Sequence, residues 1–517
     1  LRARDPPRIL LRPEGVLHIA GRMVLGDIEH VEVVPFGLKK RSFFKGKPQF
    51  VENAVCLANE RGNRVQVSFL HERSIPCGAS VYKNAGVSRL KSGGRECILD
   101  ETPAMSGFEN IFLYVFLFTS LYFEVFMLIT FFEQSPAEKN KKSVLGGLFS
   151  APSVTIIVPC HNEETSVAGT LDSLLALEYP KERLHLFVVD DGSTDGTYAV
   201  AKMYERHPNV TVFRKEKGGK HTALNFGINR ATTEFIGGLD ADSFVAPYAL
   251  AEMMRYFEEN PDIMAMTPAL KVRNPRNILE YIQHAEYSLG IFYRTMFGRL
   301  GALFVTPGPL SIYRTEVFER IGLFRSAYNT EDMEMALRMQ KNHMRIENAP
   351  RAHVETIVPR TLPTLLRQRV RWVQGFLQNA IQYRGIFFNP RYGNLGLLVL
   401  PLGVFSIFGA VYFAAYMVVN VFSLLLDKYV QIQTIGFAGL SSSHFDLFYL
   451  STPARLFLVI GLIVMTAFLI MLGKRFAETK IVSRDIVFYF AFYAFIAPLW
   501  LAKALYNTAL AKESVWK

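Results

Sequence analysis

Cysteine is scarce in this chain, with four residues in 517, and no two of them form a C-x-x-C pair. This excludes a disulfide-rich scaffold and argues against a structural zinc site. Cys56, Cys77 and Cys97 lie in the first hundred residues, so a disulfide between two of them would leave the third unpaired. The composition also lacks the bias typical of intrinsic disorder or collagen.

Targeting and low-complexity signals are missing as well. Residues 1–30 contain scattered arginines and no apolar core, so they do not resemble a signal peptide. No internal repeat or low-complexity tract is evident. Lys and Arg (57) outnumber Asp and Glu (46), which gives a net charge of +11. This excess fits nucleic acid, an anionic membrane surface or a phosphate-bearing substrate, and composition alone does not choose among them.

Long apolar runs are present, and they indicate a multi-pass membrane protein. Crossing the bilayer core takes about 20 mainly apolar residues, and such runs are rare in soluble domains. Four blocks meet this length, at 111–132, 395–426, 456–473 and 486–507. The alternative is that they are buried helices of a large soluble protein.

Loop charge predicts the orientation of these spans. The loop 474–485 and the segment after the first span are rich in Lys and Arg, which places both on the cytoplasmic side. We therefore expect a cytoplasmic central region at the plasma (inner) membrane. Residues 1–107 would then lie outside. They contain short β-like segments, such as 31–35 and 64–69, and no motif that indicates their role.

Residues 150–363 alternate strand and helix signals. β-branched runs at 154–158, 185–190 and 210–213 are separated by helical stretches, and a further apolar strand ends near residue 242. Repeated β-α-β units predict an α/β domain with a mostly parallel sheet covered on both faces. Ligands of such sheets bind at the carboxyl ends of the strands, where polar clusters occur here.

Carboxylates follow two of these predicted strands. Asp190 and Asp191 precede a Gly-Ser turn, and they fit contacts to a nucleobase or ribose as well as a plain turn. Asp240 and Asp242 are one residue apart at a strand end, which suits Mg²⁺ or Mn²⁺ shared with substrate phosphates. A solvated turn is the alternative. Glu163 after the first strand is a weaker candidate.

Three further groups are candidates for catalysis and binding. Glu331 and Asp332 follow Thr330, so Asp332 fits a general base for a hydroxyl, although the same residues suit a helix start. Lys220 follows a Gly pair and could meet phosphate. The segment 364–390 predicts an amphipathic helix at the membrane surface. Its candidates for diphosphate and acceptor binding are Gln368, Arg369, Arg371 and Trp372.

In this order, the motifs resemble the membrane-embedded, processive branch of family 2 glycosyltransferases, which have the GT-A fold. That group includes hyaluronan, chitin, cellulose and poly-N-acetylglucosamine synthases. The resemblance covers about residues 150–510. It implies a GT-A (nucleotide-diphospho-sugar transferase) domain, a UDP-sugar donor and a Mg²⁺ or Mn²⁺ cofactor.

The resemblance also implies roles for the residues. Glu163, Asp190, Asp191, Lys220 and Asp240 would contact the nucleotide sugar. The metal would lie on Asp240 and Asp242, and Asp332, with Glu331, would deprotonate the acceptor. Gln368, Arg369, Arg371 and Trp372 would bind the diphosphate and the acceptor end.

The function expected from this resemblance is inverting transfer of N-acetylglucosamine or another hexose to a β-linked polysaccharide at the bilayer, with no nucleic-acid partner. A homo-oligomer or secretion partners would complete a pore. Two alternatives remain: transfer of one sugar to a lipid-linked acceptor, and a nucleotide-binding transporter or scaffold. The transporter reading requires polar residues in the middle of the spans, and the later three spans contain few.

Overall fold

The computed structural model describes residues 107–133, 151–435 and 454–511, together with the backbone of short strands between Ile9 and Leu99. It divides into two units, Leu1–Leu113 and Tyr114–Lys517. The expected β segments 31–35 and 64–69 coincide with strands β4 (Glu32–Val34) and β8 (Arg64–Phe69). The side chains of Cys56, Cys77 and Cys97 lie outside the described part, so the disulfide question is not addressed.

Nine strands of the first unit form one sheet in the order β5-β4-β1-β2-β7-β8-β11-β10-β9, and β3 pairs with β6 separately. The remaining strands of this unit are β1 (Ile9–Leu11), β2 (Val16–His18), β3 (Met23–Val24), β5 (Arg41–Ser42), β6 (Phe50–Val51), β7 (Ala54–Ala58), β9 (Ser80–Asn84), β10 (Val87–Ser92) and β11 (Arg95–Leu99).

The second unit contains an eight-stranded sheet in the order β14-β13-β12-β15-β18-β17-β19-β16. The pairs on both sides of β12, and those of β13 with β14 and β17 with β19, are parallel. β18 and β16 pair antiparallel with their neighbours. The strands are β12 (Val154–Cys160), β13 (Leu184–Asp191), β14 (Val210–Lys215), β15 (Phe235–Gly238), β16 (Ser243–Val245), β17 (Ile263–Val272), β18 (Ser311–Arg314) and β19 (Arg345–Thr356). The predicted α/β domain with a mostly parallel sheet is therefore confirmed.

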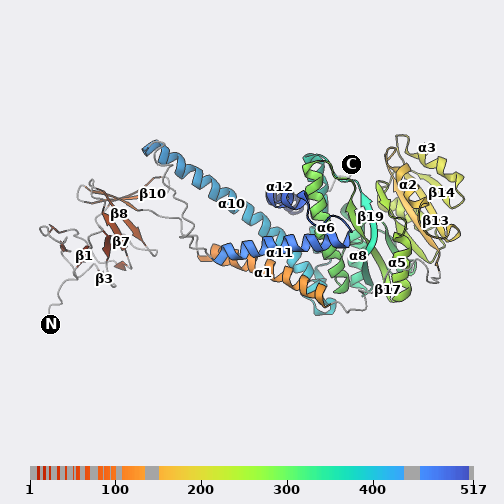
Figure 1. Ribbon diagram of the computed structural model, residues 1–517, viewed down its shortest axis with the longest axis horizontal. Coiled ribbons are helices and arrows are strands. Elements are labelled where there is room, and N and C mark those ends of the chain that lie inside the picture. The colour runs from red at the N-terminus through yellow and green to blue at the C-terminus, as the bar shows by residue number, and fades with distance from the viewer. Residues whose placement is uncertain are drawn as a thin grey trace. The chain divides into compact units, whose positions relative to one another are not determined.

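Helices cover this sheet (Figure 1). They are α2 (Val167–Leu175), α3 (Thr197–Lys202), α4 (Lys220–Ile228), α5 (Ala249–Glu259), α6 (Ile278–Arg299), α7 (Glu316–Ile321) and α8 (Glu331–Lys341). Helix α9 (Leu362–Gln382) packs against α12 (Arg484–Ala509), α8 and η5 (Ala327–Asn329) instead. Short 3₁₀ turns are η3 (Lys181–Arg183), η4 (Met203–Arg206), η5 (Ala327–Asn329), η6 (Arg384–Ile386) and η7 (Pro390–Tyr392). The start of α6 is fixed by a capping box, in which Asn277 and Glu280 satisfy each other's backbone N–H groups.

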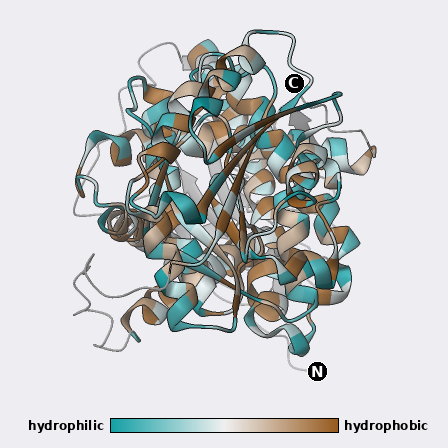
Figure 2. Ribbon diagram, turned by 90° about the vertical axis from the view of Figure 1, so that its right-hand side faces the viewer, coloured by the Kyte–Doolittle hydropathy of each residue, from teal (hydrophilic) through white to brown (hydrophobic). Residues whose placement is uncertain are grey.

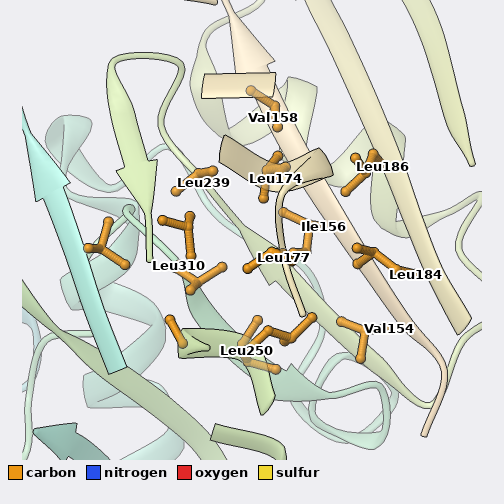
Figure 3. Packing of buried hydrophobic residues seen from close by; sticks show 14 of the residues in the cluster. Val154, Ile156, Val158, Leu174, Leu177, Leu184, Leu186, Leu239, Leu250 and Leu310 are labelled. Carbon is orange, nitrogen blue, oxygen red and sulfur yellow. The ribbon is translucent and has the colours of Figure 1, made fainter. Parts of the chain in front are cut away.

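The main core lies between β12, β13 and the helices on one face of the sheet. Val154, Ile156 and Val158 alternate along β12 and pack against Leu184 and Leu186 of the next strand (Figure 3). In the view of Figure 2, the strands at the centre of the domain are coloured largely as hydrophobic. Burial on both faces gives these strands their continuous apolar sequence, and the rigid sheet positions the polar residues that follow each strand.

Four helices of this unit are long and apolar enough to cross a membrane. They are α1 (Gly107–Phe132), α10 (Leu400–Ile435), α11 (Ala454–Phe476) and α12 (Arg484–Ala509), and a π turn, η8 (Leu395–Val399), precedes α10. Pro401 is the second residue of α10, which directly follows this π turn, and α12 continues through Pro498. Between α1 and α11, the Thr466 hydroxyl donates to Glu124 at 2.6 Å.

The turn between α11 and α12 is anchored on α6 of the α/β domain. Lys474 Nζ lies 2.8 Å from Asp485 Oδ1, and both side chains are almost fully buried. The other carboxylate oxygen of Asp485 lies 2.6 Å from His284 Nδ1. Because a buried ion pair is costly to break, Lys474 fixes Asp485, and Asp485 in turn holds His284 of α6 against α11 and α12.

Candidate active site

Residues from three separate motifs meet in one pocket at the carboxyl ends of the central strands. Asp240 follows β15, Lys220 begins α4, and Glu331 and Asp332 begin α8. All four line the same pocket, together with Gly308. The sheet places its strand ends at one edge, so carboxylates that are far apart in sequence lie around one space.

Lys220 bridges the acidic groups of this pocket. Its Nζ lies 2.5 Å from Asp240 Oδ1 and 3.7 Å from Glu331 Oε1. Burial lowers the pKa of Lys220, but the charges of Asp240, Glu331 and Asp332 outweigh it and leave this pKa raised. The lysine is therefore a fixed cation at the strand end, which suits a site for phosphate oxygens.

Asp332 is held in place by its neighbours and has a perturbed carboxyl group. The Thr306 hydroxyl donates to the Asp332 carbonyl at 2.8 Å, and the Met333 N–H donates to Oδ1 at 2.9 Å. Burial, followed by the charge of Glu331, raises the pKa of Asp332 to about 6. A carboxylate with this pKa is a stronger base than an exposed aspartate and is still deprotonated near pH 7.

Gly308 packs directly against the Lys220–Asp240 pair. A Cβ built on Gly308 would lie within 2.8 Å of both carboxylate oxygens of Asp240 and would also meet Lys220 Nζ. The backbone approaches the charged pair closely because this residue has no side chain. The sequence shows a Gly-Pro turn here but does not reveal this contact.

Asp240 and Asp242 fit the binding of a divalent cation. Burial raises the pKa of Asp242 to about 6, and the charges of Asp240 and Glu163 add to this increase. A divalent cation bound at Asp242 would offset these negative charges. In the part of the chain that the structure describes, no cluster of three or more His, Cys, Asp or Glu residues forms a complete metal cage. Two carboxylates suit Mg²⁺ or Mn²⁺, which take their other ligands from phosphate and water.

Asp190 and Asp191 hold the loops at the ends of β13 and β14. Asp191 accepts from the Gly218 and Gly219 N–H groups at 3.0 and 2.7 Å, and its Oδ1 lies 2.5 Å from Lys215 Nζ. Asp190 lies 3.2 Å from Arg214 Nε. Both are buried, and neither lines the pocket that contains Asp332. Their contact with a nucleotide stays a prediction.

Glu163 lies beside these loops, and its charge reaches the metal-binding candidates. Its N–H donates to the Thr197 hydroxyl at 2.8 Å, and its Oε2 accepts from Ser166 at 2.6 Å. It contributes to the raised pKa of Asp242 described above. The negative charge of Glu163 thus acts on Asp242, although the two motifs are about 80 residues apart in the chain.

Helix α9 packs onto the segment that contains the candidate base. A Cβ on Gly375 would lie 2.5 Å from Thr330 Oγ1, and Asn379 Nδ2 donates to the same oxygen at 3.0 Å. Arg371 is one turn before Gly375, so it lies on the face of α9 that meets this segment. The Nε of Arg371 is buried and makes no hydrogen bond in the described structure.

Arg369 connects Trp372 to helix α6. Its guanidinium donates to Glu286 Oε2 at 2.7 Å and to Gln368 Oε1 at 3.0 Å, and it lies 4.2 Å from the centre of the Trp372 ring. The side chain of Arg369 is buried, whereas Trp372 is 36% exposed. Burial lowers the pKa of Arg369, but the adjacent Glu286 outweighs it and leaves the pKa raised. The Arg369–Glu286 ion pair thus fixes the guanidinium against the Trp372 ring, and the rest of this flat indole stays accessible to solvent.

Sequence reasoning missed Glu286 and Gly375. Glu286 occurs in a helix without any motif, and its partner Arg369 is 83 residues away. Gly375 gave no specific signal, because its importance lies in its close approach to Thr330 of another element.

Comparison with known families identifies the domain. The model of the family "Glycosyl transferase family 2" matches residues 155–322. The chain carries a family 2 glycosyltransferase domain. The resemblance inferred from the motifs is thereby confirmed, and the four apolar helices agree with its membrane-embedded branch.

Two curated relatives are similar to this chain over about half of its length. The chain is 30% identical over 269 residues to a poly-beta-1,6-N-acetyl-D-glucosamine synthase of Staphylococcus epidermidis, which is 52% of this chain and 65% of the relative. It is 30% identical over 271 residues to the synthase of the same name from Staphylococcus aureus strain COL, with the same coverage. The match spans less than two thirds of the length of these relatives.

A solved structure supports the fold. A mannosyltransferase from Pyrobaculum calidifontis in complex with GDP-Man and Mn²⁺ superposes with a TM-score of 0.50 and 20% identity. The match covers 78% of this chain and 98% of that one. The GT-A fold expected from the motifs is therefore confirmed.

Proposed function

We propose that this protein transfers N-acetylglucosamine from UDP-N-acetylglucosamine to the end of a β-linked polysaccharide at the membrane. The observation that carries this proposal is the meeting of Asp332, Lys220 and Asp240 in one pocket of a family 2 domain. The choice of sugar and of a polymeric product is supported by the name of the relatives, poly-beta-1,6-N-acetyl-D-glucosamine synthase.

The reaction is a single displacement at the anomeric carbon. Asp332 removes the proton from an acceptor hydroxyl, whose oxygen attacks the anomeric carbon from the side opposite the diphosphate. The bond from that carbon to the diphosphate oxygen breaks, and UDP leaves with the bonding electrons. One displacement inverts the configuration, so an α-linked donor gives a β-linked product.

The cationic residues stabilise the leaving group. Lys220 lies beside Asp240 and Glu331, and it would bind phosphate oxygens as negative charge develops. Arg371 would assist from α9. Asp240 and Asp242 would hold Mg²⁺ or Mn²⁺, which supplies further charge neutralisation to the diphosphate when bound. Glu163, Asp190 and Asp191 would fix the uridine side, directly or by shaping the two loops.

The acceptor would rest on the open face of Trp372. The exposed indole, held by Arg369, offers a flat apolar surface against which a sugar ring packs, and Gln368 lies beside it. Because α9 also contacts Thr330, the acceptor surface and the base belong to one packed unit. An acceptor bound there would direct its hydroxyl toward Asp332.

The test is a transfer assay with the full chain in detergent. Purified protein is incubated with UDP-N-acetylglucosamine and Mg²⁺ or Mn²⁺, and the product is sized. We expect a polymer, and loss of activity on chelation of the metal. Asp332→Asn should lower the rate by about 10²- to 10⁴-fold. Glu316→Gln, on the exposed end of α7, is the matched control and should retain it.

Other outcomes would contradict this proposal in distinct ways. A single addition to a lipid acceptor would show a non-processive transferase. UDP binding without any transfer would favour a nucleotide-binding transporter or scaffold. An Asp332→Asn variant with the rate of the parent protein would mean that another group is the base.

The proposal includes a cytoplasmic catalytic domain in a multi-pass protein of the plasma (inner) membrane. It is supported by the Lys- and Arg-rich turn 474–485, which is anchored on the catalytic domain through Asp485. Protease treatment of sealed inside-out vesicles should cleave this domain, and right-side-out vesicles should protect it. The reverse pattern would overturn the orientation. The same digest locates residues 1–107.

A further inference from the structure

Helix α12 has the length and apolar content of a membrane span, but it packs along the catalytic domain instead of leading away from it. At its start, the Asp485 carboxylate lies 2.6 Å from His284 Nδ1 of α6. Near its end, Asn507 Nδ2 donates to Gln374 Oε1 of α9 at 3.4 Å. Between these two contacts, α12 packs against α6 and α9, and it lies beside α6 in Figure 1. The domain therefore holds α12 along nearly its whole length.

The distance between these two contacts is comparable to the thickness of a bilayer core. Asp485 and Asn507 are 22 positions apart, which is about 33 Å at 1.5 Å per residue, and the hydrocarbon core measures about 30 Å. If α12 crossed the bilayer, the parts of α6 and α9 that pack against it would lie in hydrocarbon too. Helix α9 contains Arg367, Arg369 and Arg371, and charges at that depth are costly. Helix α9 is thus excluded from the hydrocarbon, and so is the side of α12 that packs against it.

The two ends of α12 also lie near the same ends of the neighbouring spans. Leu501 packs against a buried cluster that contains Leu400, at the start of α10, and Leu337 of α8. The other end of α12 follows the turn after α11, where Lys474 pairs with Asp485. Helices α10 and α11 follow each other in the chain, so if both cross the bilayer, the start of α10 and the end of α11 lie on the same side. Both ends of α12 are therefore on that side, whereas a span has its ends on opposite sides.

One face of α12 is apolar and open. Val487, Phe495 and Leu499 are eight and four residues apart, so they share one face of the helix, and each is more than half exposed. Lys503 continues the same face, and Arg484 lies at the start of the helix; both are exposed. An apolar helix face with cations at its ends suits the interface of an anionic bilayer, where the apolar side chains reach the acyl boundary. Since α12 runs between the ends of two spans, this face meets lipid.

We infer that α12 lies along the membrane surface, between the catalytic domain and the lipid, and does not cross the bilayer. Helices α1, α10 and α11 remain as spans, and the residues after α12 lie on the same side of the membrane as the catalytic domain. The span expected at 486–507 is thereby revised, because apolar content does not distinguish a crossing helix from one on the surface. The Tyr493 hydroxyl of α12 donates to Glu286, the partner of Arg369, at 3.5 Å. The helix thus supports the acceptor-binding residues at the lipid surface.

Protease access to the C-terminal end of the chain tests this inference. A peptide epitope is fused after Lys517 of the full chain, and sealed vesicles of both orientations are digested. We expect the epitope and the catalytic domain to be cleaved from the same side. A second chain with the epitope between α10 and α11 is the matched control, and it should be cleaved from the opposite side.

Two results of this digest would overturn the inference. One is an epitope after Lys517 that is cleaved only from the side opposite the catalytic domain. The other is a control epitope on the same side as the domain, since α10 and α11 would then not cross the bilayer. The digest compares two sides of one membrane, so its result is independent of transfer activity and of which side is cytoplasmic.

Spin labels measure how deep α12 lies. In a chain whose four native cysteines are alanine, Val487→Cys, Phe495→Cys and Leu499→Cys are labelled singly and reconstituted in anionic vesicles. Val487 and Leu499 are 12 positions apart, about 18 Å along the helix. We expect all three labels at a similar depth, about 5–10 Å into the headgroup and acyl boundary. Val464→Cys, exposed near the middle of α11, is the control and should lie deeper.

The label depths would overturn the inference in two ways. A depth difference approaching about 18 Å between the labels at 487 and 499, with the Phe495→Cys label near the bilayer centre, would show a span. Labels shielded from both water and lipid-soluble oxygen would show that protein, such as a second copy of the chain, covers this face instead of lipid. Thermal unfolding of each variant is compared with the wild type. The epitope digest changes no residue of α12 and decides the inference where a variant does not fold.

Discussion

The pH dependence of transfer is the most direct probe of the base. Burial and the Glu331 charge place the pKa of Asp332 at about 6, and only the deprotonated carboxylate accepts a proton. The deprotonated fraction is then about 91% at pH 7 and about 9% at pH 5, so kcat/KM should fall about tenfold between them.

Two substitutions should shift the acid limb of the pH–rate profile, where kcat/KM falls as the pH decreases, in opposite directions. Removing the like charge in Glu331→Gln should lower the pKa of Asp332 and move the limb to lower pH. Removing the compensating cation in Lys220→Met should raise the pKa and move the limb to higher pH. The distant Glu316→Gln variant should leave the limb where it is, because this side chain is exposed on α7.

The assay is initial rate at subsaturating donor and acceptor between pH 4.5 and 8.5, with unfolding followed in parallel. A carboxyl whose folded-state pKa is raised loses its stabilising effect as pH rises through about 6, so acid does not unfold the protein through Asp332. Loss of activity in acid while the protein stays folded would therefore indicate protonation of Asp332. An acid limb that stays in place in Glu331→Gln would refute the assignment of the base.

Two further predictions concern the support of α9. Gly375→Ala should lower the free energy of unfolding by about 1–3 kcal/mol and also lower activity, because its Cβ would collide with Thr330. Gly385→Ala is the control, because its Cβ meets open space, and it should behave as wild type in thermal unfolding and transfer assays. Glu286→Gln should destabilise the protein by about 3–5 kcal/mol, because it leaves Arg369 buried without its ion-pair partner. The same variant should raise the KM for the acceptor. An unchanged denaturation midpoint would contradict the predicted loss of stability.

The fold was readable from the sequence because it depends on local patterns. Continuous β-branched runs such as 154–158 and 185–190 are what a doubly covered strand requires, and the structure has β12 and β13 there. The four apolar blocks likewise lie in helices of sufficient length. The helix limits were less accurate: α10 extends beyond residue 426 to Ile435, since apolar content alone does not mark where a helix ends.

Part of the candidate site was also readable, since Asp240 and Asp332 each follow a recognisable pattern and meet in one pocket. Their chemistry was not. Asp332 has its raised pKa only because folding buries it beside Glu331, and Asp191 has both oxygens engaged by residues 24 to 28 positions away. Sequence spacing gives no measure of burial or of such contacts.

By itself, the sequence determined the class of protein: a mostly parallel α/β domain with carboxylates at its strand ends, joined to apolar helices. These features follow from hydrophobic periodicity and short motifs, which act over a few residues. Tertiary structure alone decided that Glu286 supports Arg369 and that Gly308 packs against the Lys220–Asp240 pair. The physical reason is that pairing, burial and close packing depend on distances between elements that are far apart in the chain.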